Sequence, residues 1–509
     1  MRKEIVVDIN PYQTRVVLLE DDSPSEIYIE RRGRERLVGN IYKGRVQNVL
    51  PGMQAAFVNI GLERNAFLYA GDIVFDKSEF QFGGHEGEQK LDVVPNIKDI
   101  VKPGQDIMVQ VIKEPVGTKG ARVTTHITLP GRSLVLMPTV NYTGVSRRIP
   151  DEGERARLKA AVDQVKPAGV GVIVRTAAAG KTEEDFAKDM AFLTHLWDHI
   201  RQRGKTAPAP RLIHAEETLL FRTLRDLFSP DIDRLVINDR EFYEKIQVVA
   251  GIISPGLQDR VELREGLPDA FDTYRLEKAI DKALSRKVWL KNGGHIVIDQ
   301  TEALTTIDVN TGRFIGSDSL QETITETNCE AAREIARQLR LRDISGIIVI
   351  DFIDMDELAD KERVLDTLRA ELRKDRTKSN VLGITQLGLV EMTRKKTRQC
   401  ISNTLQVPCP YCGGDGRVLS RETMVLKVRK KLMRAIAEGE DGAYLVRVSP
   451  PVAELIEENS QGGFSLLPKA PGYETYVQAI PGMHVEAFTI APITSQEELK
   501  RIRETAKAY

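Results

Sequence analysis

The chain has 509 residues, and its 73 lysines and arginines nearly balance its 74 aspartates and glutamates, so the net charge is −1. This length predicts three or more domains, and the balanced charge excludes binding of a polyanion through overall charge, so any affinity for nucleic acid must come from local patches. The sequence has no apolar run long enough for a membrane span, no signal peptide, and four cysteines, two of them in a CxxC motif. We therefore expect a cytoplasmic multidomain protein with reduced thiols.

Three short strands are predicted at the beginning of the chain, in residues 5–9, 14–19 and 26–30. Apolar, β-branched runs separated by turn residues are typical of such strands. Asp8 lies near the end of the first strand, a position compatible with catalysis in an RNase H-like layout. No second acid follows at a recognisable spacing, and we therefore interpret Asp8 as structural.

From Val38 the pattern changes to short strands separated by glycine-rich corners. The predicted strands are residues 40–46, 54–60, 65–68, 106–113 and 121–127. Five short strands of this kind fit an OB-fold. Between them, residues 71–96 form a polar insertion that we expect to be a mobile loop.

Two aromatic residues of this predicted barrel, Phe57 and Phe67, are accompanied by polar and cationic residues. These neighbours are Tyr42, Lys43, Arg45, Lys113 and Lys119. Single-stranded nucleic acid is held in this way, with bases stacked on rings and phosphates neutralised by cations. The alternative is that either phenylalanine belongs to the barrel core, but the pairing with basic neighbours favours binding.

Residues 129–215 predict an α/β segment whose most informative part is a strand in residues 169–176. This strand ends in Arg175 and Thr176, and a helix begins at about Thr182. A guanidinium, a hydroxyl and exposed amides at such a junction suit a terminal phosphate. The alternative is a surface arginine that is simply solvated.

The segment of residues 295–355 predicts a strand, a helix and a second strand. The first strand places Asp308 and Asn310 on one face, and the second is a buried apolar run that ends at Asp351. The helix between them, about residues 319–340, carries an apolar stripe formed by Leu320, Ile324, Ile335 and Leu339. This arrangement brings two acids to neighbouring strand ends, where open α/β sheets usually place their sites.

Two carboxylates in one site repel each other unless a cation lies between them. Mg²⁺ suits this position because it takes hard oxygen ligands, and Asn310 would orient one carboxylate or a phosphate. The alternative is that Asp351 and Asp354 cap a following helix in residues 355–373. A basic run in residues 391–398 concentrates positive charge near the proposed metal site, although a solvated helix face is the ordinary interpretation of such a run.

Cys409 and Cys412 form a Cys-Pro-Tyr-Cys-Gly knuckle that is typical of one half of a zinc site. Structural zinc takes four ligands, and the remaining cysteines, Cys329 and Cys400, form no second knuckle. The simplest completion is the same loop of another subunit, which predicts a zinc-linked dimer. An intrachain site with Cys400 and a histidine, or a thioredoxin-like redox pair, are the alternatives.

Taken together and in this order, these segments resemble the ribonuclease E/G family over essentially the whole chain. The matching motifs are Asn40-Ile-Tyr-Lys-Gly44, Ala55-Ala-Phe57, Gly131 through Met137, Val174-Arg-Thr176, Ile307-Asp-Val-Asn310, Glu330-Ala-Ala through Arg342, Val349-Ile-Asp-Phe-Ile-Asp-Met355 and Cys409-Pro-Tyr-Cys412. The resemblance favours a metal site over a helix cap for Asp308 and Asp351.

The resemblance implies a multidomain α+β fold. An RNase H-like subdomain is split around an S1-type OB-fold and a 5′-sensor α/β subdomain, and a DNase I-like α/β subdomain, a zinc link and a small α/β dimerisation domain follow. The expected boundaries are 1–36 and 216–283 for the RNase H-like parts, 37–128 for the OB-fold, 129–215 for the sensor, 284–405 for the DNase I-like subdomain, 406–418 for the zinc link and 419–509 for the small domain.

The activity implied is that of a Mg²⁺-dependent endoribonuclease that cleaves single-stranded, A/U-rich RNA and leaves 5′-phosphate and 3′-hydroxyl ends. Asp308 and Asp351 would bind the metal, with Asn310 assisting. Side chains expected to hold RNA are Phe57, Phe67, Lys119, Lys43 and Lys113. Those expected to form a sensor for a 5′-monophosphate are Arg175, Thr176, Gly131 and Val135.

The resemblance also implies that Cys409 and Cys412 share a structural Zn²⁺ with a partner protomer, in a homodimer or a tetramer. Two features depart from the family pattern: the insertion at residues 71–96, and an end soon after the small domain. The second favours a ribonuclease G-like enzyme of ribosomal RNA processing and messenger decay over a ribonuclease E-type catalytic core. Rival hypotheses are an OB-fold RNA-binding protein with a degenerate nuclease domain, and a zinc-linked scaffold for other proteins.

Overall fold

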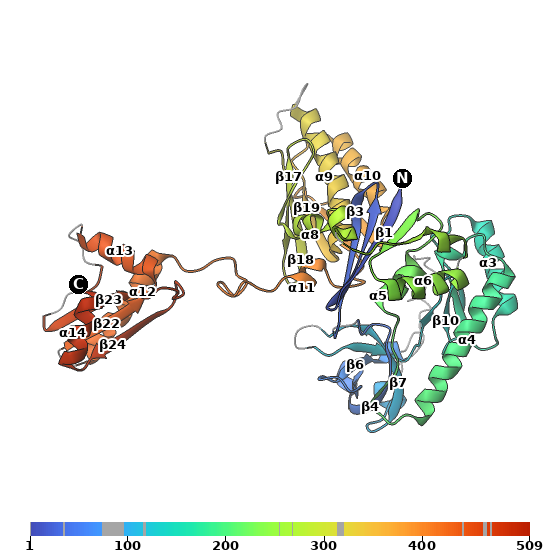
Figure 1. Ribbon diagram of the computed structural model, residues 1–509, viewed down its shortest axis with the longest axis horizontal. Helices are drawn as coiled ribbons and strands as arrows, with labels where there is room; N and C mark the ends of the chain where they lie inside the picture. Colours follow the sequence, from blue (N-terminus) through green and yellow to red (C-terminus); the bar gives the residue numbers. More distant parts are fainter. Residues whose placement is uncertain are drawn as a thin grey trace. The chain divides into compact units, whose positions relative to one another are not determined.

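The computed structural model describes residues 2–33, 36–73, 96–115, 119–253, 255–266, 268–312, 320–439, 442–461, 466–468 and 471–508. The chain divides into two compact units, Met1–Thr404 and Leu405–Tyr509 (Figure 1). Multiple sheets with helices packed against them make this a multidomain α+β protein. Every helix in the described ranges is too short or too polar to cross a membrane.

Two segments far apart in the sequence build the first sheet of the larger unit. Its strands are β1 (Lys3–Ile9), β2 (Gln13–Glu20), β3 (Ser23–Arg31), β14 (Arg234–Ile237) and β15 (Val261–Leu263), in the order β15-β14-β1-β2-β3. The accompanying helices are α5 (Leu219–Asp226), α6 (Arg240–Ile253), α7 (Ala270–Thr273) and α8 (Leu276–Leu284). The three strands predicted in residues 5–30 are confirmed, and β1 pairs in parallel with β14.

Asp8, on β1, is buried in a network of hydrogen bonds within this sheet. Its carboxylate accepts from Arg15 Nε at 2.9 Å and from Asn238 Nδ2 at 2.7 Å. A buried carboxylate that is fully occupied by a guanidinium and an amide stabilises the sheet rather than a substrate. The structural interpretation of Asp8 agrees with this geometry.

A small barrel follows, closed by five strands as the sequence predicted. They are β4 (Ile41–Leu50), β5 (Ala55–Asn59), β6 (Ala66–Tyr69), β7 (Asp106–Lys113) and β8 (Arg122–Thr124), and β7 pairs back onto β4. β13 (Arg211–His214) extends the sheet beside β4, and α2 (Ile97–Ile100) precedes β7. Most of the insertion predicted at residues 71–96 lies outside the described residues.

Tyr42, which the sequence placed among the neighbours of Phe57 and Phe67, belongs to the barrel core. Its side chain is 6% exposed and packs with Val46, Val58 and Val109. The reason is the alternation of β4, which turns Tyr42 inward and Lys43 outward. Tyr42 is therefore excluded as a platform for a base.

The third sheet carries the residues predicted to bind a terminal phosphate. It consists of β9 (Leu129–Pro130), β10 (Leu134–Met137), β11 (Thr143–Val145) and β12 (Gly171–Val174), and the helices α3 (Glu152–Val165) and α4 (Glu183–Thr206) pack against it. The strand predicted in residues 169–176 is shorter at both ends. The helix predicted from about Thr182 is confirmed, because Thr182 is the N-cap of α4 and forms a capping box with Asp185.

The fourth sheet, which we call the mixed sheet, holds the two predicted acids. Its strands are β16 (Lys287–Trp289), β17 (His295–Gln300), β18 (Leu304–Asn310), β19 (Gly346–Asp351), β21 (Val390–Arg394) and β20 (Ser379–Ile384), in that order. The helices α9 (Leu320–Arg342) and α10 (Leu358–Leu372) lie side by side (Figure 1) and bury one face of the sheet. We call the opposite face, which exposes Thr306, Ile347 and Thr393, the open face.

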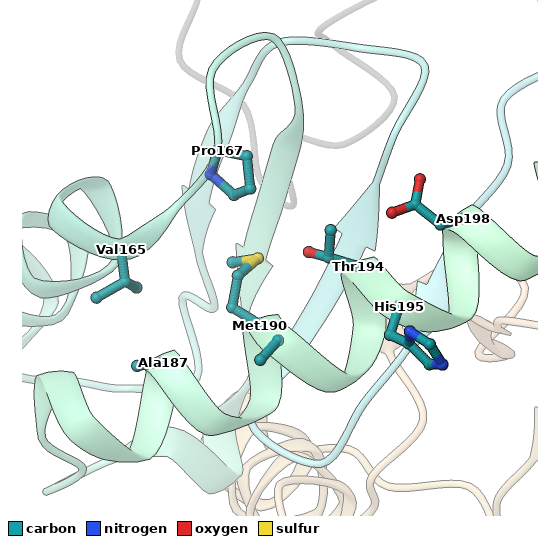
Figure 2. A pocket seen from close by; sticks show the side chains of 8 residues that line it. Val165, Pro167, Ala187, Met190, Thr194, His195 and Asp198 are labelled. Atoms are coloured by element: carbon teal, nitrogen blue, oxygen red, sulfur yellow. The ribbon is translucent and has the colours of Figure 1, made fainter.

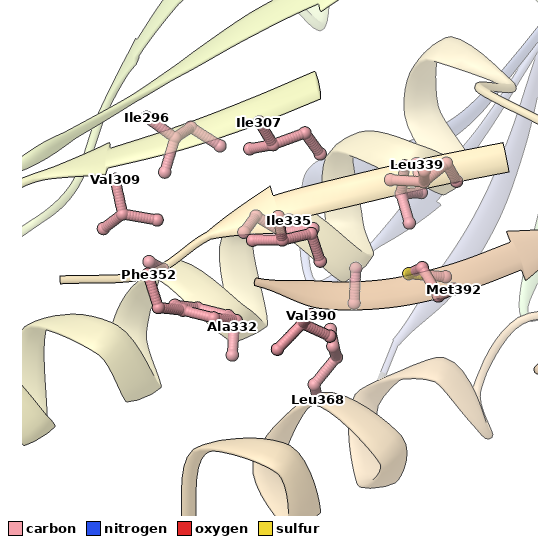
Figure 3. Close-up of a cluster of buried hydrophobic side chains, with 14 of the residues drawn as sticks. Ile296, Ile307, Val309, Ala332, Ile335, Leu339, Phe352, Leu368, Val390 and Met392 are labelled. Atoms are coloured by element: carbon pink, nitrogen blue, oxygen red, sulfur yellow. The ribbon is translucent and has the colours of Figure 1, made fainter. Parts of the chain in front are cut away.

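The core beneath the mixed sheet is continuous between strands and helices. Figure 3 shows Ile307 and Val309 of β18 pointing toward Ile335 of α9, with Phe352 in the same cluster. Since successive residues of a strand point to opposite faces, the burial of Ile307 and Val309 turns the residue between them outward. That residue is Asp308.

The apolar stripe predicted for α9 is correct only in its second half. Ile335 and Leu339 are fully buried, but Ile324 is only half-buried, and the first half of the helix buries polar residues instead. Two of these, Thr325 and Thr327, donate their hydroxyl protons to backbone oxygens one turn earlier, at 3.0 and 2.8 Å. A threonine paired in this way can be buried at little cost, which a count of apolar residues does not reveal.

The basic run in residues 391–398 is not a helix face and does not supply two of its expected phosphate-binding cations. The side chain of Arg394 is 2% exposed and binds Asp375 at 2.7 Å and Asp343 at 2.6 Å. Arg398 also binds Asp343, at 2.9 Å. These arginines neutralise buried carboxylates inside the protein.

The smaller unit is a four-stranded sheet with helices. Its strands are β22 (Gly442–Val448), β23 (Tyr473–Ala479), β24 (Phe488–Ile493) and β25 (Lys507–Ala508), in the order β24-β22-β23-β25. Its helices are α12 (Arg421–Glu438), α13 (Pro450–Gln461) and α14 (Gln496–Thr505). The short helix α11 (Ile401–Leu405) ends where the two units meet in the sequence.

Candidate functional site

The structure places the two predicted acids directly opposite each other. Asp308 and Asp351 are register partners at the ends of β18 and β19, which run in parallel. Register partners on neighbouring strands share a face, and their Cα atoms are about 5 Å apart. Both side chains are exposed on the open face, so the pair is accessible to a large substrate.

Asn310 lies two residues after Asp308 on the same face of β18. Its Nδ2 donates to Asp308 Oδ2 at 2.8 Å, which fixes the orientation of that carboxylate. The alternative of a helix cap for Asp351 and Asp354 is excluded, because the N-cap of α10 is Glu357 and no side chain caps the helix. The helix also begins later than the sequence predicted, at Leu358.

Asn328, on α9, is a positioning residue that the sequence analysis missed. Its fully buried side chain donates to Ile353 O at 2.8 Å and accepts from Ile353 N at 3.0 Å. Two hydrogen bonds from one amide fix the backbone just beyond Asp351. The sequence did contain a signal for this role. A polar residue on the buried face of a predicted helix requires a hydrogen-bond partner.

The acid pair fits Mg²⁺ by the chemistry of its donors. Mg²⁺ takes oxygen ligands, and it is usually held by one or two carboxylates with water and substrate phosphate completing the shell. Among the described residues, no group of three or more His, Cys, Asp or Glu side chains is arranged to hold a metal. The remaining ligands of an ion bound at Asp308 and Asp351 would therefore be water and phosphate oxygens.

His295 borders the acid pair and was also missed as a site residue. It is the register partner of Asn310, and Val297 is the partner of Asp308. Burial and the nearby charge of Lys287 lower the pKa of His295, against the opposing effect of Asp308. Its ring lies 5.3 Å from the ring of Trp289, centroid to centroid.

In the barrel, the register aligns two aromatic and two cationic residues across four neighbouring strands. Phe57 pairs with Phe67, Phe67 with Arg122, and Arg122 with Lys113. The two rings meet edge to face, with centroids 6.0 Å apart. They alternate with buried Ala56, Val58, Ala66 and Leu68, so they face outward and are not the barrel core.

Arg122 was missed, although it stands at an outward position of a predicted strand. Its guanidinium binds Asp72 with Nε at 2.8 Å and Nη2 at 3.0 Å. Lys119 is exposed and lies two residues before Ala121, whose carbonyl accepts from Phe67 N at 2.7 Å. Arg122 therefore lies beside Phe67, and Lys119 lies three residues before Arg122 in the chain.

Lys43 is not brought to this aromatic pair. Its register partners are Met108 and Arg211, whereas Phe57 pairs with Asn48 farther along β4. At about 3.3 Å per residue, Lys43 and Asn48 are some 16 Å apart along the strand. Lys43 thus faces outward at the other end of the strand.

The residues predicted to recognise a terminal phosphate converge at the end of β12. Arg175 Nη1 donates to Gly131 O at 2.6 Å, and Nη2 binds Asp226 Oδ1 at 2.6 Å. Thr176 Oγ1 lies 3.0 Å from Ser146 Oγ. Val135 is half-buried on β10 opposite Ile173. The guanidinium is therefore held in place by a carbonyl and a carboxylate.

Asp226 and three further arginines complete this cluster. Burial acts to raise the pKa of Asp226, but the hydrogen bond from Arg225 and the charges of Arg225 and Arg175 outweigh it and hold the pKa below its usual value. Arg376 Nη1 donates to Asp226 O at 3.1 Å, and Arg148 donates to Arg376 O. Arg376 lies in the loop after α10, about 200 residues from Arg175 in the sequence, so the sequence did not reveal that the two residues meet at Asp226.

A cavity of about 420 Å³ lies elsewhere on this subdomain, between the end of α3 and α4 (Figure 2). It is lined by Val165, Pro167, Ala187, Met190, Ala191, Thr194, His195 and Asp198. None of the predicted phosphate-binding residues is among them. The cavity is therefore separate from the Arg175 cluster.

Cys409 and Cys412 lie in a turn between α11 and α12, with no strand before them. Backbone amides of Cys412 and Tyr411, followed by the Cys412 thiol, lower the pKa of Cys409. Gly416 N donates to Cys412 Sγ at 3.3 Å. Amides directed at sulfur favour thiolates and hence metal binding, and the turn lacks the strand–helix setting of a thioredoxin-like pair.

Cys400 belongs to the larger unit and is already engaged there. Its sulfur accepts from Gln300 Nε2 and from Ser402 Oγ, each at 3.3 Å. Cys329 is buried in the core of the mixed sheet. Cys400 and Cys329 thus lie apart from the turn of Cys409 and Cys412, and zinc binding by this turn stays a prediction.

Comparison with known proteins gives a consistent family assignment. A family model described as the ribonuclease E/G family matches residues 128–397. Ribonuclease G of Salmonella typhimurium (strain SL1344) is 44% identical over 490 residues, which cover 96% of this chain and 99% of the relative. Ribonuclease G of Haemophilus influenzae is 46% identical over 92% of this chain and 94% of the relative. Ribonuclease E of Haemophilus influenzae is 35% identical over 99% of this chain but only 53% of its own length.

Proposed function

The chain belongs to the ribonuclease E/G family and is an endoribonuclease of the ribonuclease G type, and on this premise we propose that Asp308, Asn310 and Asp351 form its catalytic centre. The observation that carries the proposal is the direct opposition of Asp308 and Asp351 on the open face. Two exposed carboxylates side by side repel each other unless a cation is shared between them. The substrate we propose is A/U-rich single-stranded RNA.

The chemistry of the centre follows from its donors. When bound, Mg²⁺ supplies a nucleophilic water and neutralises charge on the phosphate. Asp308 and Asp351 would hold the ion, and the hydrogen bond from Asn310 keeps the carboxylate of Asp308 oriented. Asn328 fixes the backbone after Asp351, so that both carboxylates keep their separation. The proposed products carry 5′-phosphate and 3′-hydroxyl ends.

We assign the barrel to an S1-type OB-fold that holds the RNA. The row of Phe57, Phe67 and Lys113 offers rings for stacking and a cation for phosphate on one outward face, and Arg122, which lies in the same row, is held by Asp72. Such a surface binds single strands with little preference for sequence. We assign the sheet of β1, β2, β3, β14 and β15 to an RNase H-like subdomain and the mixed sheet to a DNase I-like subdomain.

We propose that the Arg175 cluster senses a 5′-monophosphate. Arg175 and Thr176 would contact the phosphate oxygens, and Gly131 and Val135 would shape the pocket. The support is the convergence of Arg175, Arg148 and Arg376 with a pair of hydroxyls. Arginine with hydroxyl donors is a common arrangement for phosphate.

The quaternary proposal is a homodimer joined by Zn²⁺, with Cys409 and Cys412 from each protomer as the four ligands. A cytoplasmic location fits the four free thiols. In the cell we propose a role in ribosomal RNA processing and messenger decay.

The experiment that tests the function uses one A/U-rich oligoribonucleotide with either a 5′-monophosphate or a 5′-hydroxyl, with and without Mg²⁺. We expect internal cleavage that requires Mg²⁺ and is faster with the monophosphate. Ligation and extension of the products would identify the 5′-phosphate and 3′-hydroxyl. Equal rates on both substrates would contradict the sensor, and cleavage without any divalent ion would contradict the metal site.

A further inference from the structure

The open face of the mixed sheet carries an aromatic pair beside the acids. On the edge strand β16, Val288 packs against the core, so Lys287 and Trp289 point to the open face. The register continues this face across the sheet: Trp289 pairs with His295, and His295 pairs with Asn310. A second row runs from Lys287 through Val297 to Asp308 and Asp351.

Trp289 is 64% exposed although it is the largest type of apolar side chain. It is nevertheless fixed by two contacts. The ring of His295 lies 5.3 Å away at an interplanar angle of 54°, and Lys287 Nζ lies 4.2 Å from the indole centroid. Because its neighbours hold it, the ring is a preformed surface, and little conformational entropy is lost when a flat ligand stacks on it.

His295 adds a second observation at the same place. Its Nδ1 atom is shielded from solvent and has no hydrogen-bond partner among the described residues. A polar atom in that condition is unfavourable unless a ligand or water completes its hydrogen bonding. The position therefore combines a stacking surface, a cation and an unpaired ring nitrogen.

Trp289 and Lys287 lie close enough to the acid pair to contact a nucleotide next to the cleaved bond. Neighbouring strands are about 4.8 Å apart, so Trp289 stands about 10 Å from Asn310, and Lys287 about 10 Å from Asp308, between Cα atoms. An RNA strand whose scissile phosphate lies at Asp308 and Asp351 passes over β17 and β16 if it runs across the sheet.

We propose that Trp289 and His295 form a stacking subsite for a nucleobase of the RNA strand adjacent to the scissile phosphate, with Lys287 neutralising a neighbouring phosphate. This inference rests on the proposed function of the acid pair and adds the place where the substrate is gripped beside it. A base is favoured over a protein partner because the exposed ring is flanked by a cation, which suits a phosphate-linked base. Stacking of this kind accepts any base.

The first test is fluorescence, because the chain contains two tryptophans, Trp197 and Trp289. In the double variant Trp197→Phe, Asp308→Asn, emission comes from Trp289 and the RNA stays intact. A short A/U-rich oligoribonucleotide is expected to quench this emission, whereas an abasic ribose-phosphate oligomer of equal length is expected to quench little at the same occupancy. The matched variant Trp289→Phe, Asp308→Asn reports on Trp197 in α4, which should not respond.

The second test is kinetic. With the otherwise unaltered enzyme, Trp289→Ala is expected to raise KM about 5- to 100-fold with a smaller effect on kcat, because stacking contributes mainly to binding. Trp289→Phe should retain most of the affinity. The control is Phe192→Ala on α4, where Phe192 is 65% exposed, and this variant should keep the wild-type KM.

Any of three results would contradict the proposed stacking subsite. The first is equal quenching by the abasic oligomer, and the second is an unchanged KM in Trp289→Ala. The third is a changed molecular mass of Trp289→Ala with unchanged RNA affinity. The last result would identify the patch as a contact with another protein chain. Quenching by RNA in the Asp308→Asn variants, together with no Mg²⁺-dependent cleavage by the wild-type protein, would instead support the subsite and contradict the proposed catalytic centre, so the two failures are distinguishable.

Discussion

At the scale of single residues, the site depends on side chains that orient others. Asp308 and Asp351 are exposed and do not hold each other in place. Asn310 orients the carboxylate of Asp308, and Asn328 fixes the backbone beyond Asp351. Asn310 acts on a carboxylate directly. Asn328 acts through the backbone of Ile353, from within the helix that covers the other face of the sheet.

Replacing Asn328 by alanine should lower both stability and turnover. The partly buried amide and carbonyl of Ile353 would lose their partner, which costs about 1–3 kcal/mol of unfolding free energy. Urea denaturation measures that loss, and we expect kcat to fall more than KM rises. The control is Asn403→Ala in α11, where the side chain is exposed. Unchanged stability and kcat in Asn328→Ala would show that the backbone holds its position without this residue.

At the scale of elements, the barrel presents its row of rings and cations through strand register. Lys113→Ala should remove one phosphate contact, so the slope of log affinity against log salt should become shallower by about 0.7. Anisotropy with an Asp308→Asn background measures this over a range of KCl concentrations. Lys188→Ala, an exposed lysine of α4, is the control. A slope unchanged by Lys113→Ala would place the RNA on another face of the barrel.

Many elements were predictable from the sequence because their patterns are local. The alternation of residues 303–310 and the apolar run of residues 346–351 predicted β18 and β19, and their parallel register then brought Asp308 to Asp351. Registers between distant segments were not predictable. This is why Arg122 and Arg376 were missed, and why Lys43 was grouped with rings that lie at the other end of β4.

The role of charged side chains was predicted wrongly where those side chains are buried. Residues 391–398 predicted a basic patch, but Arg394 and Arg398 neutralise Asp343 and Asp375 inside the protein. The partners are distant in the sequence, so only the fold reveals them. In the same way, the polar first half of α9 is buried because its threonines bond to their own helix and Asn328 bonds to Ile353.

At the scale of the whole molecule, the pair of cysteines predicts how protomers are joined. Chelation of zinc, or Cys409→Ala, should reduce the assembly to about half its mass, because two thiolates supply only half of a tetrahedral site. Light scattering together with a metal assay measures both quantities. Cys400→Ser is the control and should retain metal and mass. Zinc loss in Cys400→Ser would support the intrachain site instead, and an unchanged mass after verified zinc loss would contradict the shared site.

The central claim is that Asp308 and Asp351 together carry the cleavage of RNA. Its most direct test is a Mg²⁺ titration of the cleavage rate for the wild type, Asp308→Asn and Asp351→Asn, with RNA binding measured in parallel. We predict that each substitution lowers the rate at saturating Mg²⁺ by at least about 100-fold while RNA affinity stays within a few-fold of the wild type. Wild-type rates in either variant, or equal losses of binding and cleavage, would contradict the assignment of the catalytic centre.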